Sequence, residues 1–201
     1  MSWIDIIPFE ESSGTLKKLY NGIKGPSGYL DNIMLVHGLR PHTMLGHMTL
    51  YKNVLHHHQN TIPRWFLETI GVYVSHLNIC DYCVLHHLKG LKKLLGNNQK
   101  FKNIQLNLQS DLFFELFDNK FRKALNYSKN LTKDASAVSK SDIEELTEVG
   151  FTQGEILEIN QVTAYFNYAN RTVLGLGVNV AGDRLGLSPN NDSEESNWTH
   201  K

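Results

Sequence analysis

The stretch from Arg64 to Leu95 reads RWFLETIGVYVSHLNICDYCVLHHLKGLKKLL, and it decides the fold class. Its first part, up to Leu77, places apolar residues around nearly the whole circumference of a helix, which predicts a buried helix. Its second part begins at Asn78, a residue suited to capping, and predicts a helix that stops at Gly96. The stretch therefore predicts two consecutive helices, the first of them buried.

Helical signals continue on both sides of this stretch. Residues 1–40 read as irregular chain with short helical pieces, and apolar residues recur at helical spacing over residues 42–59. The TIP sequence at residues 61–63 predicts a helix start, with the threonine hydroxyl as cap and the proline in the first turn. Beyond a polar loop expected around residues 97–103, another helix is predicted from the four-residue spacing of Phe113, Phe117, Phe121 and Leu125.

Two sequences of capping-box form predict helix starts nearer the C-terminus. The first, at residues 141–144, predicts a short helix that ends near Gly150. The second, at residues 152–155, predicts a longer helix that is apolar over much of its circumference. The strand-like stretch at residues 173–180 contains two glycines, which makes a strand there unfavourable. The chain as a whole is therefore expected to be all-α.

Composition limits the class of protein. The chain has 201 residues, 41% of them hydrophobic, and a net charge of zero from 20 Lys and Arg against 20 Asp and Glu. This length suits a single domain, a helical bundle expected over residues 1–187, followed by a disordered polar tail at residues 188–201. The lack of a basic excess speaks against a nucleic-acid partner. We also expect no membrane span and no secretory signal, and hence a cytoplasmic protein.

The chain contains two cysteines, Cys80 and Cys83, and they form one C-x-x-C pair. A secreted disulfide scaffold would need several scattered cysteines, and a four-cysteine zinc site is impossible with two. In a reducing compartment, a lone C-x-x-C pair is more often chemical than structural. The pair is therefore the first candidate for a reactive site.

Helical spacing brings further groups to this pair. Cys80 precedes Cys83 by three residues and His87 follows by four, so the three side chains share one helix face. The helix N-terminus favours a thiolate at Cys80, whereas the imidazole of His87 can accept the proton of Cys83, so spacing leaves the attacking sulfur open. Glu68 lies on the preceding helix and enters the same pocket if the two helices pack together. A lone carboxylate there is suited to passing protons.

Together these residues carry a resemblance. Their pattern, E-x11-C-x2-C-x3-H, resembles the motif of the alkylhydroperoxidase D superfamily, which includes the carboxymuconolactone decarboxylases. The text VSHLNICDYC at residues 74–83 is most similar to the uncharacterised peroxidase-related branch of that superfamily. The decarboxylase branch lacks the cysteine pair, so decarboxylation is not expected. The likeness extends over about residues 5–180, through segments at residues 39–41, 150–151, 164–167, 170–171 and 176–178.

The resemblance implies a fold, an assembly and an activity. It implies an all-α bundle that forms homo-oligomers, usually trimers or hexamers. It implies that Cys83 attacks a hydroperoxide and becomes a sulfenic acid, and that Cys80 donates a proton and then closes the disulfide. His87 would activate Cys83, and Glu68 would begin the proton relay. The expected protein is a thiol peroxidase of the peroxiredoxin type that uses an external dithiol as reductant, without cofactor or metal.

One position departs from the motif of alkylhydroperoxidase D proper, which has a histidine immediately before the second cysteine. This chain has Tyr82 there. The departure motivates one alternative, a disulfide reductase or redox relay with little peroxidase activity. A non-enzymatic alternative is a thiol redox sensor or a zinc-stabilised assembly module, with zinc held by the two thiolates, His87 and either Glu68 or His76.

Overall fold

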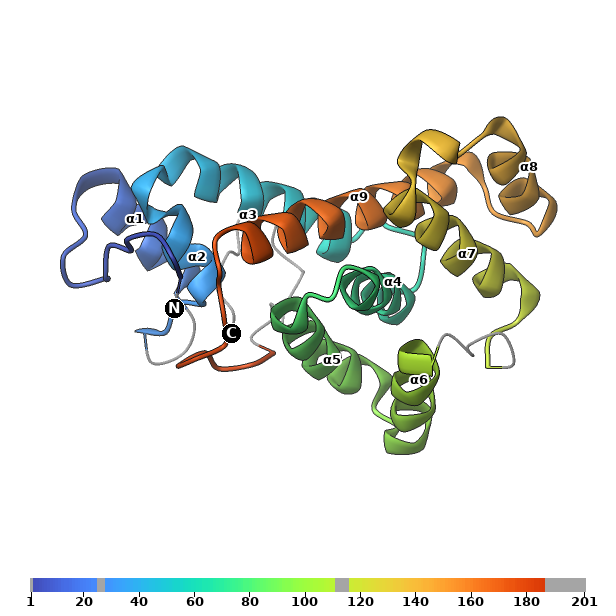
Figure 1. Ribbon diagram of the computed structural model, residues 1–201, viewed down its shortest axis with the longest axis horizontal. Helices are drawn as coiled ribbons and strands as arrows, with labels where there is room; N and C mark the ends of the chain where they lie inside the picture. Colours follow the sequence, from blue (N-terminus) through green and yellow to red (C-terminus); the bar gives the residue numbers. More distant parts are fainter. Residues whose placement is uncertain (1, 25–27, 111–115, 187–201) are drawn as a thin grey trace.

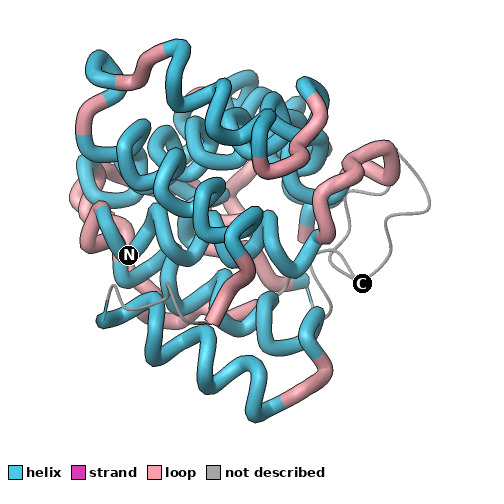
Figure 2. Tube along the Cα trace, turned by 90° about the vertical axis from the view of Figure 1, so that its right-hand side faces the viewer, coloured by secondary structure: helices cyan, strands magenta, loops and turns pink. Residues whose placement is uncertain are grey.

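The computed structural model describes residues 2–24, 28–110 and 116–186. Within these ranges the chain contains helices and no strand, as Figures 1 and 2 show. The α-helices are α1 (Gly14–Ile23), α2 (Asn32–Val36), α3 (Pro41–His56), α4 (Arg64–Leu77), α5 (Asp81–Leu95), α6 (Asn98–Ser110), α7 (Asn119–Lys133), α8 (Lys140–Glu148) and α9 (Gln153–Gly175). Two 3₁₀ turns, His37–Leu39 and Ala135–Ala137, complete the described elements. The predicted all-α class is confirmed.

Four expectations concern the whole chain. No helix in the described ranges is long and apolar enough to cross a bilayer. The predicted tail at residues 188–201 lies outside the described residues, so its disorder stays a prediction, as does the domain boundary at residue 187. The predicted homo-oligomer also stays a prediction.

Helix α4 is the centre of the bundle. It packs against α3, α5, α6, α7 and α9, and Figure 1 shows it nearly end-on beside the long α9. Every residue from Phe66 to Ser75 is buried, which confirms the buried helix predicted from its apolar circumference. Each large apolar side chain removed from water in this way contributes about 1.5–3 kcal/mol to stability.

The crossing of α4 and α9 depends on a glycine. A Cβ atom built on Gly71 would lie 2.2 Å from the ring of Phe166, so only a residue without a side chain lets α9 approach this closely. Phe166 in turn stands edge-on against the ring of His87, with centroids 4.6 Å apart. The glycine thus sets the position of an aromatic ring that packs on a candidate site residue.

The turn between α4 and α5 differs from the prediction. Asn78 is the C-cap of α4 rather than the N-cap of α5, and Cys80 is itself the N-cap of α5 rather than part of its first turn. The chain changes direction between the two helices at Ile79, whose φ of 57° lies in the left-handed region that β-branched residues rarely adopt. The backbone N–H of Cys80 then donates to the carbonyl of Ser75 at 2.9 Å.

The prediction of a loop around residues 97–103 was wrong, because residues 98–103 belong to the helix α6. The side chain of Asn97 accepts a hydrogen bond from the N–H of Lys100 at 2.9 Å, which supports the helix start. Ile104 and Leu108, four residues apart, are almost completely buried. Packing of these two apolar residues therefore outweighs the polar composition that indicated a loop.

Two other helices begin differently from the prediction. The threonine at residue 61 does not cap α4, because its N–H and hydroxyl donate to the carboxylate of Glu158, and Pro63 is the N-cap. The helix predicted from the phenylalanine spacing begins only at Asn119, after the capping residue Asp118, so that Phe117 precedes it. Phe113 lies outside the described residues. Physically, a side-chain cap decides this start, and the apolar spacing does not.

The two predicted capping boxes have different outcomes. The box of α8 is made by Ser139 and Asp142, two residues earlier than predicted, since the N–H of Ser139 donates to the Asp142 carboxylate at 2.8 Å. The box of α9 is confirmed at Thr152 and Glu155, with both reciprocal hydrogen bonds present.

Candidate active site

Helices α2, α3, α5 and α9 surround a pocket. Polar and aromatic side chains from these helices and from neighbouring segments form its wall, which is a composition typical of ligand sites. The lining residues are Asp31, Ile33, Met34, His47, Met48, Tyr51, Tyr82, Cys83, His86, His87, Tyr165, Ala169 and Gly186.

Two of the predicted site residues are hydrogen-bonded to each other beside this pocket. Nδ1 of His87 lies 2.8 Å from Oε2 of Glu68, which confirms that α4 and α5 bring the two side chains together. The Glu68 residue is fully buried, and its Oε1 has no hydrogen-bond partner among the described residues. A carboxylate bonded to Nδ1–H leaves Nε2 of His87 as the atom that can accept a proton.

The two cysteines are free thiols and differ in acidity. A hydrogen bond donated to the sulfur of Cys80, together with burial, raises the pKa of Cys83 well above its usual value. The pKa of Cys80 is lowered, because its sulfur accepts hydrogen bonds from the thiol and from the backbone N–H of Cys83. The first negative charge therefore forms on Cys80, at the N-terminus of α5. Of the two, Cys83 is the one that lines the pocket.

Asn170 is a site residue that the sequence did not reveal. It is fully buried in α9, and its side chain hydrogen-bonds to the sulfur of Cys83, which favours the thiolate there. Its Nδ2 also donates to Oγ of Ser75 at 3.0 Å, and its Oδ1 accepts from Asn78 at 2.9 Å. The asparagine thus ties α9 to the turn that carries the thiols. An asparagine on an otherwise apolar helix face was the available signal.

Tyr82, at the position that departs from the motif, has its hydroxyl engaged away from the thiols. The hydroxyl accepts from the N–H of Ile33 at 3.2 Å and hydrogen-bonds to the carboxylate of Asp183. Burial and the nearby carboxylates raise the pKa of Tyr82 well above its usual value. This tyrosine keeps its proton and cannot replace a relay histidine.

The wall of the pocket that α3 forms contains a histidine to which the sequence assigned no role. His47 is buried in α3 between the rings of His37, Tyr165 and Tyr168, with centroids 5.1–5.9 Å away. Burial lowers the pKa of His47 to about 3. It therefore lines the pocket as a neutral ring. The sequence gave no sign of this, because tertiary packing alone places His47 here.

The zinc site considered from the sequence is not assembled from its expected residues. Within the described residues, the side chains that converge as three possible metal ligands are Asp31, His86 and Asp183, without either cysteine. His86 thus belongs to a different cluster from its neighbour His87, which is hydrogen-bonded to Glu68.

Comparisons with known proteins give the fold. No family model matches the chain, and no curated protein matches it. Among solved structures, it is similar to an uncharacterised peroxidase-related protein with an alkylhydroperoxidase AhpD core from Ralstonia eutropha, at 20% identity and a TM-score of 0.76, over 89% of this chain and 91% of that chain. A peroxidase-related protein from a Silicibacter species matches at 20% identity and a TM-score of 0.72, over 88% and 90%.

A third solved structure is a variant of the debrominase Bmp8 in complex with 2,3,4-tribromopyrrole. It matches at 18% identity and a TM-score of 0.61, over 80% of each chain. The chain therefore has the alkylhydroperoxidase D-like fold. The resemblance seen in the sequence, to the peroxidase-related proteins of this fold, is confirmed at the level of the fold.

Proposed function

We propose that the protein is a thiol-dependent peroxidase that reduces hydroperoxides with Cys83 and Cys80. The observation that carries this proposal is the joint placement of Cys83 and of the Glu68-paired His87 on one pocket, next to a second, more acidic thiol. This is the arrangement that two-electron thiol chemistry requires: a sulfur accessible to substrate, a partner sulfur within hydrogen-bonding reach, and a path for protons.

The acidity of the thiols defines the first step. The pKa of Cys80 is lowered and that of Cys83 is raised, so Cys80 loses its proton first while Cys83 keeps its proton. When a hydroperoxide enters, the proton of Cys83 moves to the sulfur of Cys80, to which it is already hydrogen-bonded. The hydrogen bond from Asn170 stabilises the thiolate that forms on Cys83. Cys80 thus serves as the base for Cys83.

Oxygen transfer follows. The Cys83 thiolate attacks the distal oxygen of the hydroperoxide, the O–O bond breaks, and Cys83 becomes a sulfenic acid. The departing alkoxide takes the proton from Cys80 and leaves as an alcohol, or as water if the substrate is hydrogen peroxide. The Cys80 thiolate then attacks the sulfur of Cys83, and the hydroxide that is displaced takes a proton delivered through His87 and Glu68. The products are one disulfide, one alcohol and one water.

An external dithiol then reduces the disulfide and restores both thiols. The proposal includes an assembly of several copies of this chain, a trimer or a hexamer. It includes no cofactor and assigns no metal to the oxidation of the thiols.

A second candidate function is reductive debromination. The fold of the debrominase Bmp8 and the ring-lined wall formed by Tyr51, Tyr82 and Tyr165 favour it. The electron count is the same, because two thiols become a disulfide while a carbon–bromine bond is replaced by a carbon–hydrogen bond and bromide leaves with a proton. The same two cysteines would act, so substrate and product must distinguish the candidates.

The test compares two substrates with a common reductant. We expect cumene hydroperoxide to oxidise the purified protein within one turnover and dithiothreitol to sustain turnover, with no bromide released from tri- or tetrabrominated pyrroles. Release of bromide with inert peroxide would favour debromination. Thiols that resist peroxide but exchange readily with a small disulfide would favour a disulfide reductase, and inert thiols would contradict all three activities.

A further inference from the structure

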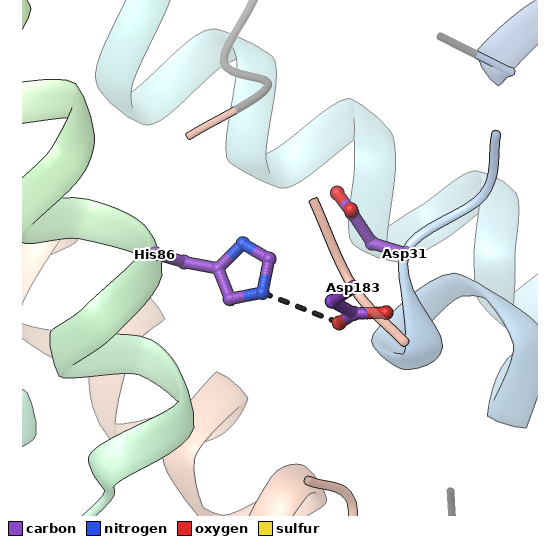
Figure 3. Close-up of side chains that lie close together, drawn as sticks. All are labelled: Asp31, His86 and Asp183. Atoms are coloured by element: carbon purple, nitrogen blue, oxygen red, sulfur yellow. Dashed lines mark hydrogen bonds and ion pairs between the residues drawn. The ribbon is translucent and has the colours of Figure 1, made fainter. Parts of the chain in front are cut away.

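A second cluster of side chains lies at the same pocket, outside the thiol chemistry. Asp31 caps α2, His86 lies on α5 one helical turn beyond Cys83, and Asp183 follows α9. Figure 3 shows the three side chains converging from these separate segments, with the imidazole of His86 pointing toward Asp183. Asp31 and His86 also line the pocket.

The geometry of this cluster fits a metal ion. One ligand atom from each residue, an imidazole nitrogen and two carboxylate oxygens, lies within 4.8 Å of the others. Nε2 of His86 is 3.2 Å from Oδ2 of Asp183. Two ligands that each bind zinc at about 2.0–2.1 Å in tetrahedral geometry stand about 3.3 Å apart, so this pair already has the required spacing.

One carboxylate oxygen of these residues has no partner among the described residues. Oδ1 of Asp31 is fully buried and has no hydrogen-bond partner among the described residues. A buried carboxylate oxygen is costly to leave unpaired, and here a second carboxylate lies within reach. Two carboxylates that face one another need a proton or a cation between them. The unpartnered oxygen is thus an observation, separate from the clustering, that points to a positively charged ligand.

Hydrogen bonds from neighbouring groups fix the carboxylate of Asp183, as they fix metal ligands in proteins. Asp183 accepts hydrogen bonds from the N–H of Asn32 and the hydroxyl of Tyr29, both at 3.1 Å, and is hydrogen-bonded to Tyr82. Its side chain is fully buried. Such surrounding donors fix the orientation of a ligating carboxylate and are typical of the shell outside metal ligands. Tyr82, the residue that replaces the motif histidine, therefore belongs to this cluster.

We infer that Asp31, His86 and Asp183 form a binding site for a divalent transition-metal ion, of which Zn²⁺ is the representative. An imidazole ligand favours zinc and its neighbours in the first transition row over Ca²⁺ and Mg²⁺, which prefer oxygen ligands throughout. Three protein ligands leave a fourth position, which faces the pocket because Asp31 and His86 line it. The site is independent of the thiol chemistry proposed above, since it uses neither cysteine.

The test measures zinc binding in the full chain with Cys80→Ser and Cys83→Ser as background, so that no thiolate can hold the metal. Competition with a chromophoric chelator should show one Zn²⁺ per chain. In this background, His86→Ala should weaken zinc binding about 100-fold or more. Asp31→Asn should do the same and is the safer variant for folding, because the oxygen it changes has no partner to lose.

The neighbouring histidine provides the matched control. His87→Ala removes an imidazole one residue away, on the same helix, and should leave zinc affinity unchanged. Co²⁺ bound to the same background should show visible d–d bands, which Asp31→Asn should abolish. Circular dichroism confirms that each variant is folded. The inference is overturned if the background binds no zinc, or if Asp31→Asn and His86→Ala bind it as tightly as the background does.

Discussion

The pocket has two sides that are built in opposite ways. Its thiol side comes from one stretch of chain, and it consists of Glu68, Cys80, Cys83 and His87. Its carboxylate side is assembled from the segment before α2, from α5 and from the segment after α9, and it consists of Asp31, His86 and Asp183. The adjacent residues His86 and His87 belong to different sides, because consecutive positions on a helix point in different directions.

The two sides of the pocket differ in how far the sequence alone predicts them. Helical spacing places Cys83 and His87 on one face of α5 and, with one helix packing, beside Glu68, whereas Cys80 is the N-cap of that helix. No local pattern connects Asp31 to Asp183, since the loop geometry before α2 and after α9 brings them together. Tyr82 joins the two sides: it stands between the cysteines in sequence, and its hydroxyl bonds to Asp183.

The largest expected effect comes from breaking the thiol side at its attacking sulfur. Cys83→Ser should reduce steady-state peroxide turnover at least about 10³-fold, because serine at neutral pH supplies no comparable nucleophile. The measurement is hydroperoxide consumption with dithiothreitol as reductant. Turnover that survives in Cys83→Ser but is lost in Cys80→Ser would reverse the assigned roles.

The next effect tests the proton relay. Glu68→Gln keeps the shape and the hydrogen bond to His87 but removes the charge, and it should lower turnover about 100-fold. The pH profile of turnover should change as well, which a merely structural role would not cause. The matched control is Glu144→Gln, which removes the exposed ion pair between Glu144 and Lys140. This variant should behave like the unaltered chain. Equal profiles for both variants would remove Glu68 from the relay.

The third effect concerns the α3 wall, which belongs to neither side. His47 has a pKa lowered to about 3 in the fold, against 6.5 when unfolded, so unfolding takes up a proton between these values. Because the ring stays neutral in the folded protein, the free energy of unfolding decreases as the pH falls below 6.5. The decrease is about 2 kcal/mol between about pH 7 and about pH 5. The neighbouring titratable groups that add to this shift are His37 and His87.

His47→Gln removes this proton uptake. Urea unfolding at both pH values should show a loss on acidification that is about 2 kcal/mol smaller in the variant than in the unaltered chain. Equal losses would mean that His47 is protonated in the folded protein.

The smallest effect concerns the turn that sets Cys80 in place. Ile79 is 81% exposed and has a left-handed backbone, so it contributes strain and little burial. Ile79→Asn should raise the free energy of unfolding by about 1 kcal/mol, because asparagine tolerates this conformation. Ile79→Val keeps the β-branch and should show no gain. A gain in both variants would point to a cause other than the backbone.

Much of the fold could be predicted because local signals and packing agree. The buried circumference of α4, the stop of α5 at Gly96 and the capping box at Thr152 each follow from short-range chemistry. The predictions failed where a tertiary contact decides. Glu158 accepts a hydrogen bond from the threonine before α4, so that this threonine does not cap the helix. Burial of two apolar residues of α6 stabilises a helix in a polar stretch.

The candidate site shows the same division. Glu68 was expected to reach the thiol helix if α4 packs against α5, and its hydrogen bond to His87 is present. The order of acidity of the thiols was not predicted, because the placement of Cys80 at the N-cap depends on the reversal at Ile79. Asn170 was missed as well, since its bond to Cys83 spans two helices that are distant in sequence.

The central claim is that Cys83 attacks and Cys80 resolves. Intact mass with peptide mapping, after one equivalent of hydroperoxide, tests it most directly. The unaltered chain should lose two hydrogens at a Cys80–Cys83 disulfide. Cys80→Ser, which lacks the base, should gain one oxygen on Cys83 more slowly, trapped as a sulfenic acid by dimedone, and Cys83→Ser should remain unmodified. Oxygen trapped on Cys80 in Cys83→Ser, with Cys83 inert in Cys80→Ser, would contradict the account.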